Sequence, residues 1–161
     1  MNRVFSKNKL LHYLLMVSVA ISTVFSTNAA YSQAVLTPLL LYFGSSAGDN
    51  FTTGTEEGRT SAINSGYYFV RKEGCAFRYP RSGTVPLKLY FGSASGDNYT
   101  TGTSDGANSA IVSGYYFVRT EGYVYPTQQP GTVPLKLYFG SASGDNYTTG
   151  TSDGANSAIV S

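Results

Sequence analysis

The chain has 161 residues, and its eleven Lys and Arg residues against nine Asp and Glu residues give a formal net charge of +2. Three of the basic residues, Arg3, Lys7 and Lys9, lie at the N-terminus, so eight basic and nine acidic groups remain in the rest of the chain. A nearly neutral chain lacks the clustered positive charge that phosphate-backbone binding needs, which excludes a nucleic-acid partner, and the length suits one domain.

The first 34 residues have the three parts of a secretory signal peptide. Basic residues up to Lys9 precede an apolar run over 14–25, and small residues follow it. The apolar run is too short to span a bilayer. We therefore predict a signal peptide over 1–34, cleaved after Ala34 or, at an earlier site, after Ala29. The alternative is an uncleaved N-terminal anchor. The predicted location is secreted, periplasmic or at the cell surface, with membrane contact only before cleavage.

The remainder, 35–161, is predicted to be a single repeat domain with a period of 48 residues. Its units are 37–84, 85–132 and an incomplete 133–161. The first two units are identical at 29 of 48 aligned positions, so the repeat is a structural unit rather than a chance likeness. The third unit stops inside its predicted helix, which predicts unpaired strand edges and possible self-association.

Each unit begins with a predicted hairpin, described here for the second unit. Apolar and polar residues alternate over 87–91, as in a strand with one buried face. The polar segment 93–98 is predicted to be a turn. The aromatic and β-branched residues of 99–103 predict a second strand, with Gly102 at a bulge.

A short helix and two more strands are predicted to complete the unit. Thr103 or Ser104 is a suitable helix cap, and Gly114 suits a left-handed helix stop. The expected buried face of the helix consists of Ala107, Ala110 and Ile111. A third strand is predicted over 115–121 and a fourth over 123–125, after an interruption at Gly122.

Three such units predict a mainly β fold with short helices. Each unit is predicted to contain two strands, a helix and two further strands. This order suits a pseudo-threefold, β-trefoil-like domain whose last repeat is incomplete. A linear β-repeat stack or a partial propeller is the alternative, because a four-stranded period near this length also suits propeller blades.

A Gly-Asp-Asn-aromatic segment recurs in every unit and is the candidate ligand-binding site. A carboxylate and an amide can together bond sugar hydroxyls, while an aromatic ring covers the apolar face of a pyranose. The alternative is a purely structural turn, since Asp and Asn after Gly favour turns. The candidate residues are Asp49, Asn50, Phe51, Asp97, Asn98, Tyr99, Asp145, Asn146 and Tyr147.

Other features of the repeat have open interpretations. The three asparagines also open N-x-T sequons, which a eukaryotic host could glycosylate. The aromatic run Tyr115, Tyr116 and Phe117 suits either a stacking platform or cross-strand packing. Arg119 and Glu121, two apart on a strand, suit an ion pair with a neighbouring strand, or a pocket in which Arg119 lines the wall. The same pair occurs in the first unit as Arg71 and Glu73.

The residues for catalysis are scarce. The only histidine, His12, lies in the predicted signal peptide, which excludes Ser-His-Asp and Cys-His nucleophile systems from the mature chain. Cys75 is the only cysteine and aligns with Tyr123, which predicts a packing position and excludes an internal disulfide. A carboxylate pair such as Asp97 and Asp105 is the remaining catalytic possibility. We predict a non-enzyme with no catalytic residues, no cofactor and no metal.

The segments PLKLYFGSASGDNYTT and GYYFVRTEGYVYPTQQPGTVPLKLYFG resemble a secreted bacterial repeat family of unknown function, whose units commonly read PLKLYW, GDNFTT and GYxFVRxEGYVF. Similar repeats accompany extracellular hydrolases as accessory modules. The resemblance starts near Val35 and implies export, a repeat fold and a non-catalytic accessory role. The chain departs from the pattern at Phe91, where Trp is frequent, at Cys75 and Ala76, which replace Tyr-Val, and in its incomplete last unit.

Three function hypotheses follow. The first is a secreted, non-catalytic recognition module that binds an extracellular glycan or cell-envelope polymer through the Asp-Asn-aromatic segments. The second is a structural or adhesive surface repeat without a small ligand. The third is a carboxylate-dependent glycoside hydrolase.

Overall fold

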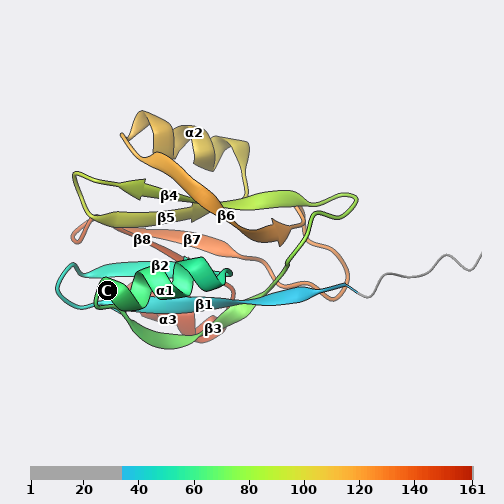
Figure 1. Ribbon diagram of the computed structural model, residues 1–161, viewed down its shortest axis with the longest axis horizontal. Coiled ribbons are helices and arrows are strands. Elements are labelled where there is room, and N and C mark those ends of the chain that lie inside the picture. The colour runs from blue at the N-terminus through green and yellow to red at the C-terminus, as the bar shows by residue number, and fades with distance from the viewer. Residues whose placement is uncertain (1–33, 161) are drawn as a thin grey trace, which may run out of the picture. The chain divides into compact units, whose positions relative to one another are not determined.

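A computed structural model describes residues 34–160 (Figure 1). The predicted signal peptide lies outside the described residues except for Ala34. The fold is mainly β with short helices, as predicted. Its elements, in chain order, are β1 (Leu36–Gly44), β2 (Asp49–Thr53), α1 (Glu56–Asn64), β3 (Tyr68–Phe77), β4 (Val85–Gly92), β5 (Asp97–Thr101), α2 (Ser104–Val112), β6 (Tyr116–Val124), β7 (Lys136–Gly140), β8 (Asp145–Thr149) and α3 (Ser152–Val160).

The strands form two open antiparallel sheets. Six strands pair in the order β2-β1-β3-β6-β4-β5, and β7 pairs with β8 in a separate hairpin. The two halves of the larger sheet meet at one pair of residues, Phe77 and Tyr123. The closed trefoil remains a prediction, because the described sheets are open.

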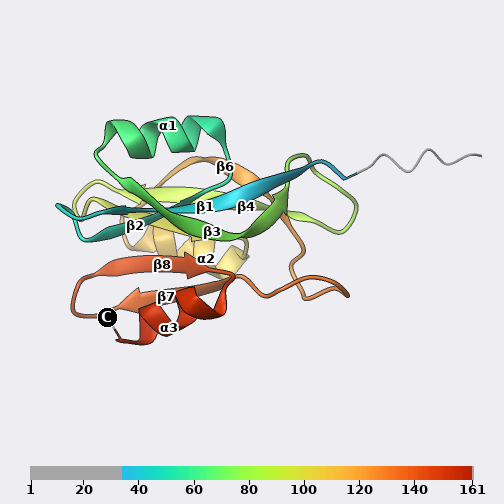
Figure 2. The ribbon, with the colours of Figure 1, turned by 90° about the horizontal axis from the view of Figure 1, so that it is seen from below.

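The helices begin where the sequence predicts. Thr55 and Thr103 cap α1 and α2, and each side-chain oxygen accepts a hydrogen bond from a backbone N–H three residues later. Gly114 follows α2 with a φ of 84°, a left-handed conformation that glycine adopts without strain. Each helix packs against its own hairpin, and Figure 2 shows α1 and α3 on opposite sides of the strands. No described helix has the length and apolar character needed to cross a lipid bilayer.

Several predicted details are wrong. There is no separate fourth strand in the second unit, since β6 continues through Gly122, whose φ of 154° accompanies a register shift against β4. Asp97 and Asn98 begin β5 rather than lying in the turn. Ile111 is exposed, so the buried face of α2 consists of Ala107 and Ala110.

The buried apolar residues form clusters that mix the sequence units. Leu89 of the second unit packs with Tyr42 and Phe51 of the first. Leu87 packs with Leu39 and with Leu135 of the third unit. Neither hairpin therefore buries its apolar face alone, and neighbouring units supply the cover.

Candidate functional site

The predicted Asp and Asn residues meet one another where β2, β5 and β8 begin. Each aspartate accepts two hydrogen bonds from the asparagine of a neighbouring unit, one from its backbone N–H and one from Nδ2. Asn98 Nδ2 lies 2.7 Å from Asp49 Oδ2, and Asn146 Nδ2 lies 2.7 Å from Asp97 Oδ2. The cycle closes where Asn50 Nδ2 donates to Asp145 Oδ2 at 2.6 Å. We call this set the Asp–Asn ring: Asp49, Asn50, Asp97, Asn98, Asp145 and Asn146.

A second cycle of hydrogen bonds lies beside the ring. The hydroxyl of Thr52 donates to the carbonyl of Thr148, that of Thr148 to Thr100, and that of Thr100 to Thr52, at 2.9, 3.1 and 3.3 Å. These hydroxyls are buried. Strands β2, β5 and β8 are therefore joined by side-chain contacts rather than by a backbone ladder.

Burial sets the electrostatics of the ring. Desolvation raises the pKa of Asp49 to about 7, and the nearby carboxyl of Asp97 adds to the rise, although the hydrogen bonds from Tyr67 and Asn98 oppose it. Desolvation also raises the pKa of Asp145. Carboxyl oxygens of Asp49, Asp97 and Asp145 all lie within 4.8 Å of one another. They are the described carboxylates that are placed to share a proton or a cation.

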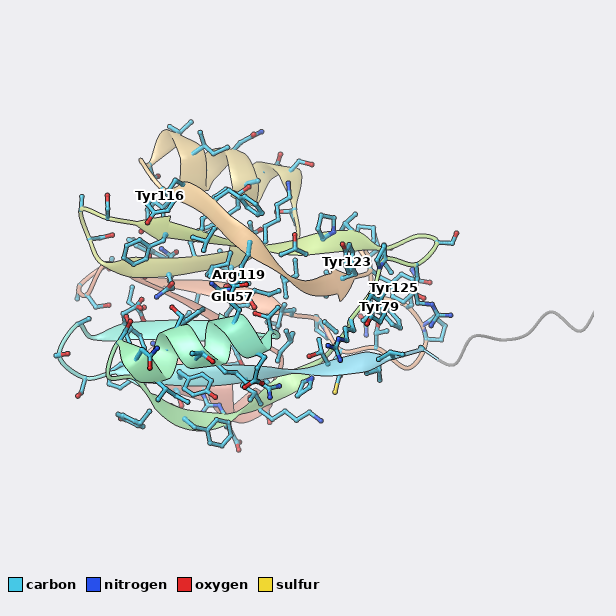
Figure 3. All side chains as sticks on the ribbon, in the orientation of Figure 1. Glu57, Tyr79, Tyr116, Arg119, Tyr123 and Tyr125 are labelled. Carbon is cyan, nitrogen blue, oxygen red and sulfur yellow. The ribbon has the colours of Figure 1, made fainter. Side chains whose placement is uncertain are left out.

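The aromatic partners of the ring do not form exposed platforms. Phe51 and Tyr147 are buried, and Tyr99 is half-buried. The Arg119 guanidinium lies over the Phe51 ring at 5.6 Å, and Arg71 lies over Tyr147 at 5.8 Å. Figure 3 shows Arg119 between β6 and α1. The six predicted Asp and Asn residues are thus brought together by hydrogen bonds, whereas the three predicted aromatic residues pack against arginines or tyrosines outside the ring.

Glu73 and Glu121 are buried carboxylates whose role the sequence did not reveal. Glu121 Oε2 accepts hydrogen bonds from Thr53 Oγ1 at 2.6 Å, from Gly54 N at 3.0 Å and from Thr55 Oγ1 at 2.9 Å. Its other oxygen lies 2.7 Å from Arg119 Nε, an ion pair by distance although the N–H is not aimed along a hydrogen bond. The carboxylate therefore joins the second unit to the start of α1 in the first.

Glu73 makes the equivalent junction to the third unit. It accepts hydrogen bonds from Thr149 Oγ1 at 2.6 Å and Thr151 Oγ1 at 3.0 Å, and it pairs with Arg71 at 2.8 Å. The predicted pair thus forms within one strand, and its two glutamates are buried rather than at the surface. The repeated Arg-x-Glu spacing was the one sign in the sequence that these glutamates matter. It could not identify their partners, because the residues that the glutamates contact lie 66 to 78 positions away.

Exposed aromatic side chains lie elsewhere, at the starts of β3 and β6. Tyr68 and Tyr116 are 56% and 55% exposed. Each packs edge-to-face on a phenylalanine of the adjacent strand, Phe43 and Phe91 respectively, with ring centroids 5.9 Å apart in both cases. We call these the aromatic pairs. Tyr115 is not among them, because its hydroxyl donates to Asp97 Oδ2 at 2.6 Å.

A cavity of about 420 Å³ lies between α1 and β6 and is lined by Arg59, Arg78 and Tyr123, among others. Figure 3 shows Tyr79, Tyr123 and Tyr125 gathered at the end of the fold where β1 begins. Sequence reasoning missed this cavity. The sequence did contain a sign of it, because Arg59 and Arg78 are positions at which the first unit departs from the second.

Cys75, which aligns with Tyr123, is exposed and does not occupy the packing position predicted for it.

Comparison with curated proteins and with solved structures found no significant match to the chain. A family model does match, over residues 38–159, which include every residue of the Asp–Asn ring and both aromatic pairs. The match spans more than half of the sequence. The chain therefore belongs to the family described as Domain of unknown function (DUF5648).

Proposed function

We propose that the chain is a non-catalytic recognition module that binds an extracellular glycan or cell-envelope polymer through the two aromatic pairs. The observation that carries this proposal is the exposure of Tyr68 and Tyr116 at equivalent positions of two units. Large apolar rings left in water at repeated positions mark interaction surfaces. A tyrosine ring can cover the apolar face of a pyranose while its hydroxyl bonds a sugar hydroxyl.

Two equivalent pairs suit a polymeric ligand. A repeating polysaccharide that reaches both pairs binds the second as an intramolecular event, which raises the apparent affinity without any new contact.

The Asp–Asn ring has a different role in this proposal. It fixes the units about a common pseudo-threefold axis, and the cyclic hydrogen bonds from an asparagine of one unit to an aspartate of the next support that arrangement.

The test compares tyrosines of equal exposure. Tyr68→Ala, Tyr116→Ala and the double variant are assayed for retention on insoluble polysaccharides and on a glycan array. Tyr79→Ala is the matched control, since Tyr79 is 58% exposed and lies outside the aromatic pairs. We expect each single variant to bind about tenfold more weakly and the double variant to lose binding, while the control binds as the unaltered chain does.

Failure of the proposal has a defined form. If the folded, unaltered chain retains no glycan, or if Tyr79→Ala weakens binding as much as Tyr68→Ala, the aromatic pairs are not the site. The structural or adhesive repeat then becomes the better hypothesis, and the ring, whose donors and acceptors satisfy one another, favours it. Polysaccharide cleavage that disappears in Asp105→Asn would instead favour the hydrolase.

A further inference from the structure

The cavity between α1 and β6 contains two arginines that the repeat does not require. Arg59 aligns with Ala107 of the second unit, and Arg78 aligns with Pro126. Ala107 is buried in an apolar cluster of its own unit. Because an alanine serves at this position of the helix, the fold itself does not need a cation there, and both arginines of the first unit line the cavity instead.

The protein satisfies little of the hydrogen-bonding capacity of the Arg59 guanidinium. Its Nη1 donates to Glu56 Oε2 at 3.3 Å, and its Nε is buried without an acceptor among the described residues. The side chain of Glu56 is 82% exposed, so the two form a surface pair, which contributes little. Most N–H groups on the two terminal nitrogens of Arg59 are therefore available to a ligand.

Arg78 brings a second cation to the same cavity from the residue directly after β3. Its backbone N–H donates to the carbonyl of Val35 at 2.9 Å, which holds this segment against the start of β1. Its guanidinium lies over the ring of Tyr79 at 5.8 Å. The ion pairs found among residues 34–160 involve other arginines, so no described carboxylate neutralises Arg78.

The acidic side chains that line the cavity are Glu56 and Glu121, and they do not cancel the two arginines. The charge of Glu121 is compensated within the protein, because it lies 2.7 Å from Arg119 and accepts three hydrogen bonds from the turn before α1. Two guanidinium groups thus face one solvent-exposed carboxylate. Concave surfaces focus such an excess of charge, which favours the entry of an anion.

The rest of the wall suits a ring that carries hydroxyl groups. Tyr123 contributes an aromatic side chain, and Figure 3 shows it with Tyr79 and Tyr125 at this end of the fold. An aromatic ring can cover the apolar face of a pyranose. Thr37 and Thr120 add hydroxyl groups to the lining. The volume of about 420 Å³ lies within the range of about 300 to 1,000 Å³ that is typical of small-molecule sites.

We propose that this cavity is a binding site for a hexuronic acid, a sugar whose ring carries a carboxylate. The carboxylate binds Arg59 and Arg78, because a planar guanidinium matches the geometry of a carboxylate and can bind both of its oxygens. The pyranose ring lies against Tyr123. The site is separate from the aromatic pairs, which lie at the starts of β3 and β6, whereas Arg78 and Tyr123 lie at the other ends of these strands.

The test titrates the full chain with sodium D-glucuronate by isothermal titration calorimetry. Sodium acetate supplies the carboxylate without the ring, and D-glucose supplies the ring without the carboxylate. We expect saturable binding of glucuronate, at least about tenfold tighter than that of either control compound. Acetate that binds as tightly as glucuronate would overturn the proposal, since the cavity would then be a general anion site. So would glucose that binds as tightly, or an unaltered chain that binds no glucuronate.

Protein variants locate the site. Arg59→Ala introduces the residue that the second unit has at this position, so the helix should still form, and glucuronate binding should weaken about tenfold or more. Arg78→Ala should have a similar effect. Lys72→Ala is the matched control, because it removes the same charge from an exposed side chain outside the cavity and should leave binding unchanged. Circular dichroism verifies that each variant is folded.

The variants also keep the two proposals apart. Tyr116→Ala, at an aromatic pair, should leave glucuronate binding unchanged, whereas Arg59→Ala should leave the retention of neutral polysaccharides unchanged. If Lys72→Ala weakens glucuronate binding as much as Arg59→Ala does, the attraction comes from the net charge of the chain and the cavity is not the site. If Tyr116→Ala abolishes it, the sugar binds at the aromatic pairs instead.

Discussion

At the residue scale, the aspartates of the Asp–Asn ring are acceptors held in a desolvated setting. Hydrogen bonds from the Asn98 backbone N–H, the Asn98 side-chain amide and the Tyr67 hydroxyl stabilise the charged form of Asp49, but burial and the neighbouring carboxyl of Asp97 outweigh them and raise its pKa. The raised pKa therefore has a thermodynamic consequence. The folded chain binds a proton at Asp49 more tightly than the unfolded chain does.

We expect Asp49 to make the chain less stable as the pH rises. Its contribution to the free energy of unfolding is complete at pH values below 3.8, the ordinary pKa of this group, and is lost as the pH increases through the folded-state pKa of about 7. Chemical denaturation of the unaltered chain and of Asp49→Asn at about pH 5 and about pH 8 measures this. The variant should be less stable overall, and the stability difference between the two chains should be smaller at the higher pH. A difference independent of pH would contradict the assignment.

Glu121 is a second residue whose charge matters. Glu121→Gln keeps the shape but leaves the Arg119 guanidinium buried without a counter-charge, so we expect the free energy of unfolding to fall by about 3 kcal/mol. Glu56→Gln is the control, because the Glu56–Arg59 pair is at the surface and should contribute less than about 1 kcal/mol. Urea denaturation of both variants measures the two changes in the free energy of unfolding. Equal decreases in the two variants would contradict a structural role for Glu121.

At the scale of elements, the turns between hairpin and helix in the first and third units are shaped by a strand that reaches them from another unit, whereas the turn of the second unit meets side chains of its own unit. Gly54 lies against the backbone of β6, and Gly102 lies against a side chain. The two glycines occupy the same position of the repeat. Because the local sequence is the same at both glycines, a difference between them reports only how closely the surrounding atoms approach.

Alanine substitution should lower the free energy of unfolding by different amounts at the two glycines. In Gly54→Ala the new methyl group meets a carbonyl oxygen that cannot move without displacing β6, and we expect a loss of about 3 kcal/mol or more. In Gly102→Ala the nearest atom is a valine methyl group that can rotate, so we expect a loss of about 1 kcal/mol. Thermal unfolding followed by circular dichroism measures both. The reverse order would show that the strand does not crowd this turn.

The elements that the sequence predicted well are those with local signals. Alternation located the first strand of each unit, and Thr103 with Gly114 bounded α2. The errors arose where the cause is distant. Gly122 suggested a break, yet its conformation absorbs a register shift inside β6. Asp97 and Asn98 have turn-forming side chains, but their partners lie 49 positions away, in Asn146 and Asp49, and no local pattern indicates them.

At the scale of the whole molecule, the Asp–Asn ring and the threonine cycle bind all three units to one another. The smaller sheet of β7 and β8 shares no backbone ladder with the larger one. Its attachment rests on side chains, among them Asn146, Thr148 and Thr149. The third unit is therefore joined to the other two by side-chain hydrogen bonds rather than by strand pairing.

This attachment should make unfolding a single event. Asn146→Ala removes the Nδ2 donor to Asp97, and we expect a loss of about 1 to 3 kcal/mol in one cooperative transition. Differential scanning calorimetry together with tyrosine fluorescence tests this, with Asn156→Ala as a control on the outer helix α3. Two separate transitions, with the six-stranded sheet surviving the first, would contradict the coupling.

The hydrogen-bonded amides of the ring also decide whether the N-x-T sequons can be glycosylated. An oligosaccharide would be attached at Nδ2 of Asn50, Asn98 or Asn146, the atom that each asparagine donates to an aspartate 2.6 to 2.7 Å away. A glycosylating enzyme cannot reach that nitrogen after the units have joined, and a sugar added beforehand would keep them apart. In this fold, sequon modification and assembly exclude each other.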